Sequence, residues 1–314
     1  MPEGSGAVRS IAVTTTAYLA PDGFEHELRD ELAIAGVAVR ARHDRLVITD
    51  APPITAAWAE NIWYDAEQIA IESIGHAAKE LRSRARNWAL YAPEHGGRAR
   101  LIAERLPYVS AKPIELDAEA PGAPLGSWTL LAPDLVLAAP HCSSAFPNGA
   151  PTMVEDRDGP PSRAYLKVWE ALVRLRRRPA PGEVCLDLGA SPGGWTWFLA
   201  QTGAQVIAVD KAPLAPNVGR LRNVEWRAGS AFGLDPVDFP EVDWLFSDII
   251  CYPGRLLTLV ERWRAAGHVR NFVCTIKFQG ETDHDIAREF AALPGASVFH
   301  LHHNKHELTF ALLG

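Results

Sequence analysis

The sequence predicts an α/β protein whose C-terminal half is a Rossmann-like, doubly wound and mostly parallel sheet. In residues 151–314, short apolar runs typical of buried strands alternate with helical segments, and this alternation is typical of such a sheet. A glycine-rich turn follows the first of these strands, and an acidic residue closes the second. Those are the usual positions of a nucleotide-binding crevice. The N-terminal half mixes strands and helices less regularly, which predicts an α+β domain.

In the N-terminal half, local patterns predict short strands separated by amphipathic helices. Strands are expected at 11–19, 46–48, 88–91, 128–131 and 135–139. Helices are expected at 24–35, where Gly36 supplies the end, at 58–86, with Trp58, Ile62, Ile69 and Ile74 among the buried positions, and at 99–106. No residue of this half forms an obvious catalytic group.

The C-terminal half is more regular, because its apolar runs are short and evenly spaced. Strands are expected at 184–188, 206–209, 224–226, 244–246, 272–276, 298–301 and 308–312. Helices are expected at 194–201, 255–265 and 283–293, after a basic helix that begins near residue 163. One strand of the final pair is expected to run antiparallel to the rest.

Length and composition limit the class of protein. A chain of 314 residues predicts two domains, and the Pro/Gly-rich stretch Pro147–Pro161 divides them into residues 1–150 and 151–314. Hydrophobic residues make up 47% and charged residues 22%, which excludes a disordered or fibrous protein. No apolar run approaches the roughly 18 residues of a membrane span, and no N-terminal segment suggests export. The four cysteines are far apart, so we expect a cytoplasmic protein without disulfides or a zinc ribbon.

The net charge of −7 gives no bulk attraction to phosphate, so a nucleic-acid partner would have to bind a local patch. Most of the acidic excess lies in residues 1–150. The stretch 163–178 is the opposite, since it holds six basic residues and only one acid, Glu170. We interpret it as a ridge that contacts RNA phosphates, and the alternative is a solvated helix face.

The glycine-rich turn runs from Asp187 to Trp195 and has the sequence DLGASPGGW. A dinucleotide fingerprint would need glycine at position 191, where Ser191 stands, so an NAD cofactor is disfavoured. S-adenosylmethionine has no pyrophosphate, and the turn could hold its amino-acid end while Asp210 accepts hydrogen bonds from its ribose. The alternative is that the glycines only permit tight packing and that Asp187 caps the helix. The residues predicted to bind the cofactor are Asp187, Gly189, Ala190, Ser191, Pro192, Gly193, Gly194, Trp195 and Asp210.

Five motifs, DLGASPGGW, VIAVDKAP, WLFSDI, CTIKFQG and NKHELTF, occur in this order. Together they resemble the FtsJ-like family of RNA 2′-O-ribose methyltransferases, and within it the large-subunit ribosomal RNA methyltransferase M type. The resemblance covers about residues 160–314 and implies a Lys-Asp-Lys-Glu catalytic tetrad, with a cytidine of 23S ribosomal RNA as the target. The matching residues are Lys167, Asp248, Lys277 and Glu307.

The resemblance also implies contacts around the cofactor. Asp248 would border it, and Ser230 would contact the adenine where relatives often carry an acid. Related enzymes have a ferredoxin-like and THUMP-like RNA-binding region before the catalytic domain, so we expect residues 1–150 to be an abridged form of that region.

The tetrad suggests a division of labour. A lysine at its ordinary pKa of about 10.4 is protonated and cannot act as a base. The base would therefore need burial and a neighbouring positive charge, which Lys167 and the sulfonium would supply. Our hypothesis is that Lys277 is the base, that Lys167 and Asp248 orient the ribose, and that Glu307 anchors the group.

Two other functions stay open from the sequence: methylation of a small molecule or protein, and RNA binding without catalysis. His300, His302, His303 and His306 do not form a metal-ligand pattern. We therefore expect no metal site, and imidazoles on a strand that face solvent or RNA.

Overall fold

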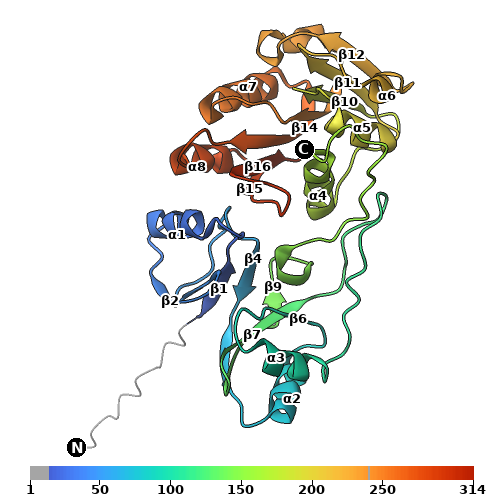
Figure 1. The fold of residues 1–314 in the computed structure, drawn as a ribbon. Helices are drawn as coiled ribbons and strands as arrows, with labels where there is room; N and C mark the ends of the chain where they lie inside the picture. The colour runs from blue at the N-terminus through green and yellow to red at the C-terminus, as the bar shows by residue number, and fades with distance from the viewer. Residues whose placement is uncertain (1–13, 240) are drawn as a thin grey trace, which may run out of the picture.

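The computed structural model describes residues 14–239 and 241–314, and it contains three sheets (Figure 1). The first part of the strand expected at 11–19 lies outside these residues, and the strand β1 spans Thr16–Leu19. No helix in the described ranges is long and apolar enough to cross a membrane.

Two antiparallel-rich sheets form the N-terminal half. The first has the order β2-β3-β1-β4-β9 and is accompanied by helix α1. Its further elements are α1 Glu25–Ile34, β2 Val39–His43, β3 Leu46–Thr49, β4 Asn61–Tyr64 and β9 His141–Cys142. The second has the order β5-β8-β7-β6 and is accompanied by α2 and α3. Its elements are β5 Glu67–Ala70, α2 Ile74–Arg84, β6 Trp88–Leu90, α3 Gly96–Ala103, β7 Gly126–Ala132 and β8 Leu135–Ala139.

The prediction of a helix at 58–86 is wrong for most of these residues. Residues 61–64 and 67–70 are strands in two different sheets, and Asp65 between them has a φ of 49°, in the left-handed region. Only Ile74–Arg84 is helical, and it begins where the Ser73 side chain accepts a hydrogen bond from the amide of His76. The strands β2 and β9 are also absent from the sequence-based expectation. Strands β4, β5 and β9 depend on pairing with distant segments, such as β4 with β1, whereas β2 pairs with the adjacent β3.

The C-terminal half contains a seven-stranded sheet of order β12-β11-β10-β13-β14-β16-β15. The first five strands are parallel, and β16 is antiparallel to both of its neighbours. The strands are β10 Val184–Leu188, β11 Gln205–Asp210, β12 Val224–Ala228, β13 Val242–Ser247, β14 Val269–Lys277, β15 Ala296–Phe299 and β16 Glu307–Leu312. The α-helices are α4 Tyr165–Leu175, α5 Gly194–Gln201, α6 Pro216–Gly219, α7 Pro253–Ala266 and α8 His284–Ala292. Short 3₁₀ helices occur at η1 Pro147–Gly149, η2 Ala231–Gly233 and η3 Pro236–Asp238. The expected fold of this half is confirmed.

Successive residues of the central strands point to opposite faces of this sheet, and each face is covered by helices. On β13, Trp244 and Phe246 pack with α4 and α5, whereas Leu245 packs with α7 and α8. Trp195 and Trp197 of α5 are buried, as expected for core residues. The sheet is therefore rigidly sandwiched, and its strand ends are fixed relative to one another.

An aromatic cluster joins the N-terminal half to this sheet. Trp58 stacks on Phe24, with 5.5 Å between ring centroids, and lies 5.8 Å from His306 and 6.1 Å from Phe278. The amide of His300 donates to the carbonyl of Ala57 at 2.7 Å. The two halves thus share one hydrophobic core, and polar contacts such as that of His306 with Glu27 also join them.

Candidate active site

The four residues of the proposed tetrad come from four elements and meet at one edge of the sheet. Lys167 lies on α4, Asp248 directly follows β13, and Lys277 ends β14. Carboxyl ends of neighbouring parallel strands lie side by side, which brings Asp248 and Lys277 together. Because β16 runs antiparallel to β14, its first residue, Glu307, pairs directly with Lys277.

The polar atoms of these residues are within hydrogen-bonding distance. Lys167 Nζ donates to Asp248 Oδ1 at 2.7 Å and Oδ2 at 2.9 Å, and to Glu307 Oε1 at 3.1 Å. Lys277 Nζ donates to the main-chain carbonyl of Asp248 at 2.6 Å and lies 3.1 Å from its Oδ1. The four side chains are only 11–18% exposed. Each charged side chain of this sheltered group thus lies within 3.1 Å of an opposite charge.

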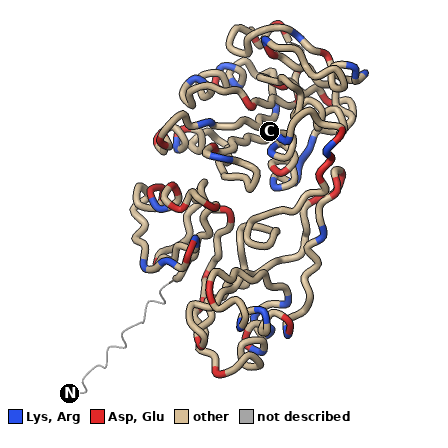
Figure 2. Tube along the Cα trace, in the orientation of Figure 1, with Lys and Arg blue, Asp and Glu red and all other residues tan. Residues whose placement is uncertain are grey.

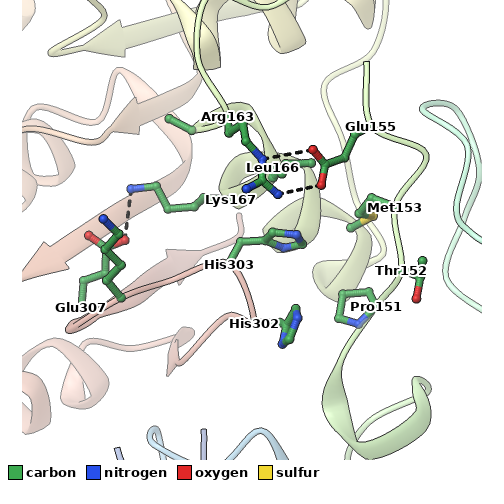
Figure 3. Close-up of a pocket in the computed structure, with 12 residues that line it drawn as sticks. Pro151, Thr152, Met153, Glu155, Arg163, Leu166, Lys167, His302, His303 and Glu307 are labelled. Atoms are coloured by element: carbon green, nitrogen blue, oxygen red, sulfur yellow. Dashed lines mark hydrogen bonds and ion pairs between the residues drawn. The ribbon is translucent and has the colours of Figure 1, made fainter. Parts of the chain in front are cut away.

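A cavity of about 850 Å³ opens beside this group (Figure 3). Its lining includes Met153, Arg163, Lys167, His302, His303 and Glu307. This volume is in the range of small-molecule and cofactor sites. A substrate in the cavity could therefore reach Lys167 and Glu307 directly.

The glycine-rich turn follows β10, the parallel neighbour of β13, at the same edge of the sheet. Asp187 is 1% exposed, and its Oδ2 accepts a hydrogen bond from Thr196 Oγ1 at 2.6 Å. Burial raises the pKa of Asp187 to about 7, and the negative charges of Asp248 and Asp210 add to that rise. Three carboxyl groups thus lie close enough to repel one another, which is an arrangement suited to a positively charged ligand.

The glycines are required by the shape of the turn. Gly189 and Gly193 have φ angles of 78° and 111°, which L side chains rarely adopt. A Cβ on Gly189 would lie 2.7 Å from Ile249 Cγ1, and one on Gly194 would lie 2.6 Å from Ser162 Oγ. The alternative interpretation, that the glycines only permit tight packing, therefore explains Gly194.

Asp210 and its neighbours complete the turn. The carboxylate of Asp210 accepts hydrogen bonds from the amides of Ser191 at 3.0 Å and Ala212 at 2.9 Å. Trp195 buries its ring and donates from Nε1 to the carbonyl of Ala164 at 3.0 Å, so only its main chain borders the turn. Ala190 is buried, Pro192 is exposed, and Ser230 directly precedes η2. Their contacts with a cofactor stay predictions.

The basic stretch 163–178 is less available than its composition suggests. The helix α4 ends at Leu175. Four arginines at and beyond the end of this helix donate hydrogen bonds to main-chain carbonyls, at 2.6–2.8 Å. Arg174 donates to Gly149, Arg176 to Pro121, Arg177 to Gly314 and Arg178 to Ala118. Figure 2 shows basic and acidic residues interspersed over the trace of the chain. Arg176 and Arg177 are nevertheless exposed, and contact between the stretch 163–178 and RNA phosphates stays a prediction.

The histidine segment also differs from expectation. The strand β15 ends at Phe299, so residues 300–306 form a turn rather than strand positions of alternating direction. His300 is buried, which lowers its pKa to about 4. His302, His303 and His306 lie within 3.2 Å of Glu60, Glu170 and Glu27, in that order. Among the residues that the structure describes, no three potential ligands are arranged to hold a metal.

Sequence reasoning does not identify Glu170, which is fully buried beside the cavity. By composition alone, Glu170 is only the single acidic residue of the basic stretch 163–178. Its position three residues after Lys167 places both side chains on one face of α4, and that spacing is the available signal.

Comparisons with known proteins agree with this geometry. Residues 160–289 match the model of the family described as FtsJ-like methyltransferase. The chain is 34% identical over 204 residues to the Ribosomal RNA large subunit methyltransferase M of Halorhodospira halophila. This alignment covers 60% of this chain and 58% of that protein. With the protein of the same name from Azotobacter vinelandii it is 34% identical over 192 residues, 56% of this chain and 54% of the other. The chain thus spans little more than half the length of these relatives.

Among solved structures, a methyltransferase of Burkholderia thailandensis that acts on 1,6-didemethyltoxoflavin, with S-adenosylhomocysteine bound, aligns with a TM-score of 0.35 and 19% identity. The alignment covers 48% of this chain and 78% of that one. This likeness is too weak to support a conclusion.

Proposed function

We propose that the protein transfers a methyl group from S-adenosylmethionine to a ribose 2′-hydroxyl of RNA, because residues 160–289 match the FtsJ-like methyltransferase family. The observation that carries the proposal is the meeting of Lys167, Asp248, Lys277 and Glu307 within hydrogen-bonding distance beside an open cavity. These four groups match, in order and type, the tetrad of the family that the chain resembles.

The glycine-rich turn fits S-adenosylmethionine. Its sulfonium and ammonium groups are positive, and Asp187, Asp210 and Asp248 concentrate negative charge at the strand ends. The turn from Asp187 to Trp195 would hold the amino-acid end. Asp210 has lone pairs beyond those used by two amides, and these would accept hydrogen bonds from the ribose. Ser230 would contact the adenine.

Bound S-adenosylmethionine supplies an electrophilic methyl group, so the protein must activate and align a poor nucleophile. Alignment contributes several kcal/mol to lowering the barrier, and a general base typically adds about 10²–10⁴-fold. The 2′-oxygen forms a bond to the methyl carbon as the carbon–sulfur bond breaks, and its proton passes to Lys277 Nζ.

Hydrogen-bond capacity separates the two lysines. Lys167 Nζ has three acceptor atoms around it, which match the three N–H groups of an ammonium ion. Lys277 Nζ has two, the carbonyl and the Oδ1 of Asp248. One position around Lys277 Nζ is thus left for a substrate hydroxyl. In this proposal Lys277 is the base, Lys167 and Asp248 orient the ribose, and Glu307 anchors Lys167.

The relatives' names support large-subunit ribosomal RNA as the substrate, and the target we propose is a cytidine of 23S RNA. The nucleotide enters the cavity beside Lys167 and Glu307. Arg163 lies at that cavity and is 75% exposed, so it is the basic residue of 163–178 best placed for RNA. The N-terminal half positions the RNA. The four free cysteines support a cytoplasmic location.

The test is methyl transfer from labelled S-adenosylmethionine to RNA from cells that lack the gene, to protein and to a small-molecule extract. We expect label only in RNA, at a ribose 2′-oxygen. Lys277→Ala should lower transfer at least about 100-fold and leave the Kd for S-adenosylmethionine unchanged. Lys79→Ala, at an exposed lysine on α2, is the matched control.

Three outcomes would overturn parts of this proposal. Label in protein or small molecules would assign a different substrate class. Cofactor and RNA binding without any transfer would indicate a non-catalytic RNA-binding protein. Near-normal transfer by Lys277→Ala would exclude that lysine as the base.

A further inference from the structure

A second polar group lies beside the cavity and is not used by the tetrad. Its centre is Glu170, whose side chain on α4 is 0% exposed. Glu170 Oε1 accepts from the amide of His302 at 2.8 Å and from Arg174 Nε at 2.8 Å. Its Oε2 accepts from the amide of His303 at 3.0 Å and lies 2.6 Å from His303 Nδ1. One buried carboxylate thus fixes both the main chain and one imidazole of the 300–306 turn.

This arrangement determines which edge of the imidazole faces a ligand. Burial would raise the pKa of Glu170, but the charges of Arg174 and His303 lower it to about 2. The ionised carboxylate can only accept hydrogen bonds, so the proton between the two groups belongs to His303 Nδ1. The remaining ring nitrogen, Nε2, has no hydrogen-bond partner within the described part of the chain.

His303 lines the cavity that contains Lys167 and Glu307. In Figure 3 the imidazole lies between Lys167 and Met153. The cavity lining near it also includes the apolar side chains of Pro151, Met153 and Leu166. The lining is therefore mixed, with apolar side chains beside charged ones. A flat, partly polar ring can contact the apolar side chains with its face and bond a polar group with its edge.

A nucleobase fits this corner better than a phosphate does. The arginines near the imidazole are already paired with acids, Arg174 with Glu170 and Arg163 with Glu155. A phosphate would have to compete with these carboxylates for the guanidinium groups. A base, by contrast, could stack on the apolar side chains and use its edge for a hydrogen bond.

Helix α4 supports both parts of this arrangement. Lys167 and Glu170 are three residues apart on one face of the helix, and Glu170 holds His303. One nucleotide in the cavity could therefore lie against both Lys167 and His303, which line it.

We propose that His303, through Nε2, hydrogen-bonds the base of the nucleotide that is methylated, and that Glu170 is the positioning residue that holds the imidazole. This inference rests on the proposed function and adds a specificity-determining contact to it. His303 does not take part in the chemistry at the ribose.

The experiment uses the full chain and four RNA oligonucleotides that carry the mapped methylation site with C, U, A or G at the target position. The wild-type protein should favour one base at least about 10-fold in kcat/KM. His303→Ala should lose about 10–100-fold on that base and little on the others, so that the preference collapses. Glu170→Gln should act in the same direction, because it loosens the ring without removing it.

Folding and cofactor binding are checked in the same variants. In His303→Ala, Glu170 keeps its bonds to Arg174 and to two main-chain amides, so the protein should fold and its Kd for S-adenosylmethionine should not change. His141→Ala, at an exposed histidine on β9, is the control and should retain wild-type selectivity.

An equal loss on all four bases would overturn the inference and assign His303 to a phosphate or to the fold. Unchanged selectivity in His303→Ala would overturn it as well. If the wild type methylated none of the RNAs, or no RNA at all, the proposed function would fail first and the inference with it. Methylation with unaltered selectivity would refute only the inference.

Discussion

Replacing Asp187 by asparagine should stabilise the free protein while weakening its binding of S-adenosylmethionine. The buried carboxyl has its pKa raised from 3.8 to about 7, first by burial and then by the charges of Asp248 and Asp210. A difference of roughly 3 pH units corresponds to about 4 kcal/mol. The wild-type protein bears this cost whenever the carboxyl must be ionised in its folded state.

The sign follows from the two pKa values. Below pH 4 the Asp187 carboxyl is protonated in both the folded and unfolded states, so it costs nothing. As the pH rises from about 4 to about 7, the unfolded state releases the proton more readily, and the free energy of unfolding falls. The asparagine side chain of the variant cannot titrate. The pH-dependent part of the stability difference between Asp187→Asn and wild type should therefore be near zero at pH 4 and reach its full value above pH 7.

The asparagine side chain removes the ionisation cost of roughly 4 kcal/mol, but it adds a smaller cost of its own. It can keep the hydrogen bond from Thr196 Oγ1, but its NH₂ group needs an acceptor in a buried position, at a cost of about 1–3 kcal/mol. We therefore expect a net gain of about 2 kcal/mol at pH 8. S-adenosylmethionine is positively charged and loses a carboxylate partner in this variant. The Kd for S-adenosylmethionine should therefore rise at least about 10-fold.

Urea unfolding at pH 4.5 and pH 8 measures the stability, and calorimetry measures the Kd. Asp22→Asn, at an exposed acid before α1, serves as the control and should change neither quantity. The reasoning fails if the difference between Asp187→Asn and wild type does not depend on pH. It also fails if cofactor binding is unaffected, since that would separate the carboxylate cluster from the ligand.

Two further variants test other parts of the structure. Gly189→Ala should lower the melting temperature and abolish cofactor binding. Its φ of 78° is unfavourable for alanine, and the added Cβ would collide with the side chain of Ile249. The control is Gly97→Ala, in open space on α3, which should be neutral or stabilising in the same thermal scan. Trp58→Leu should cost about 2–4 kcal/mol in urea unfolding and lower kcat with the cofactor Kd unchanged, because Trp58 packs on Phe278 and His306, the chain neighbours of two tetrad residues. A parallel loss of cofactor binding in Trp58→Leu would show that the effect is general unfolding.

The C-terminal sheet could be predicted because each buried parallel strand is a nearly continuous apolar run. The strand Val184–Leu188 and the helix Gly194–Gln201 have the bounds that the sequence predicts. Topology then explains why Asp248 and Lys277 meet, since both follow strands at the same edge. The N-terminal half could not be predicted as well. Strand β4 is four residues long and is held by pairing with β1 and β9, which local periodicity does not register.

The site is a harder case, because its supporting contacts join distant segments. The bond between Glu170 and His303 spans 133 residues, and that between Arg177 and Gly314 spans 137. Charge composition describes residues 163–178 as one basic surface, but Arg176 and Arg178 point their guanidinium groups at main-chain carbonyls of the 116–121 segment. A sequence pattern gives the type of a side chain, whereas its partner depends on the tertiary fold.

Helix α4 shows why these contacts belong together. Lys167, Glu170 and Arg174 recur at intervals of three and four residues, so they share one face of the helix. Lys167 reaches the tetrad, Glu170 holds the 300–306 turn, and Arg174 binds both Glu170 and the carbonyl of Gly149. A rotation or shift of α4 would therefore change the reacting group, the cavity wall and the attachment to the preceding segment at the same time. The charged side chains of this helix therefore bind groups within the site and fix its geometry.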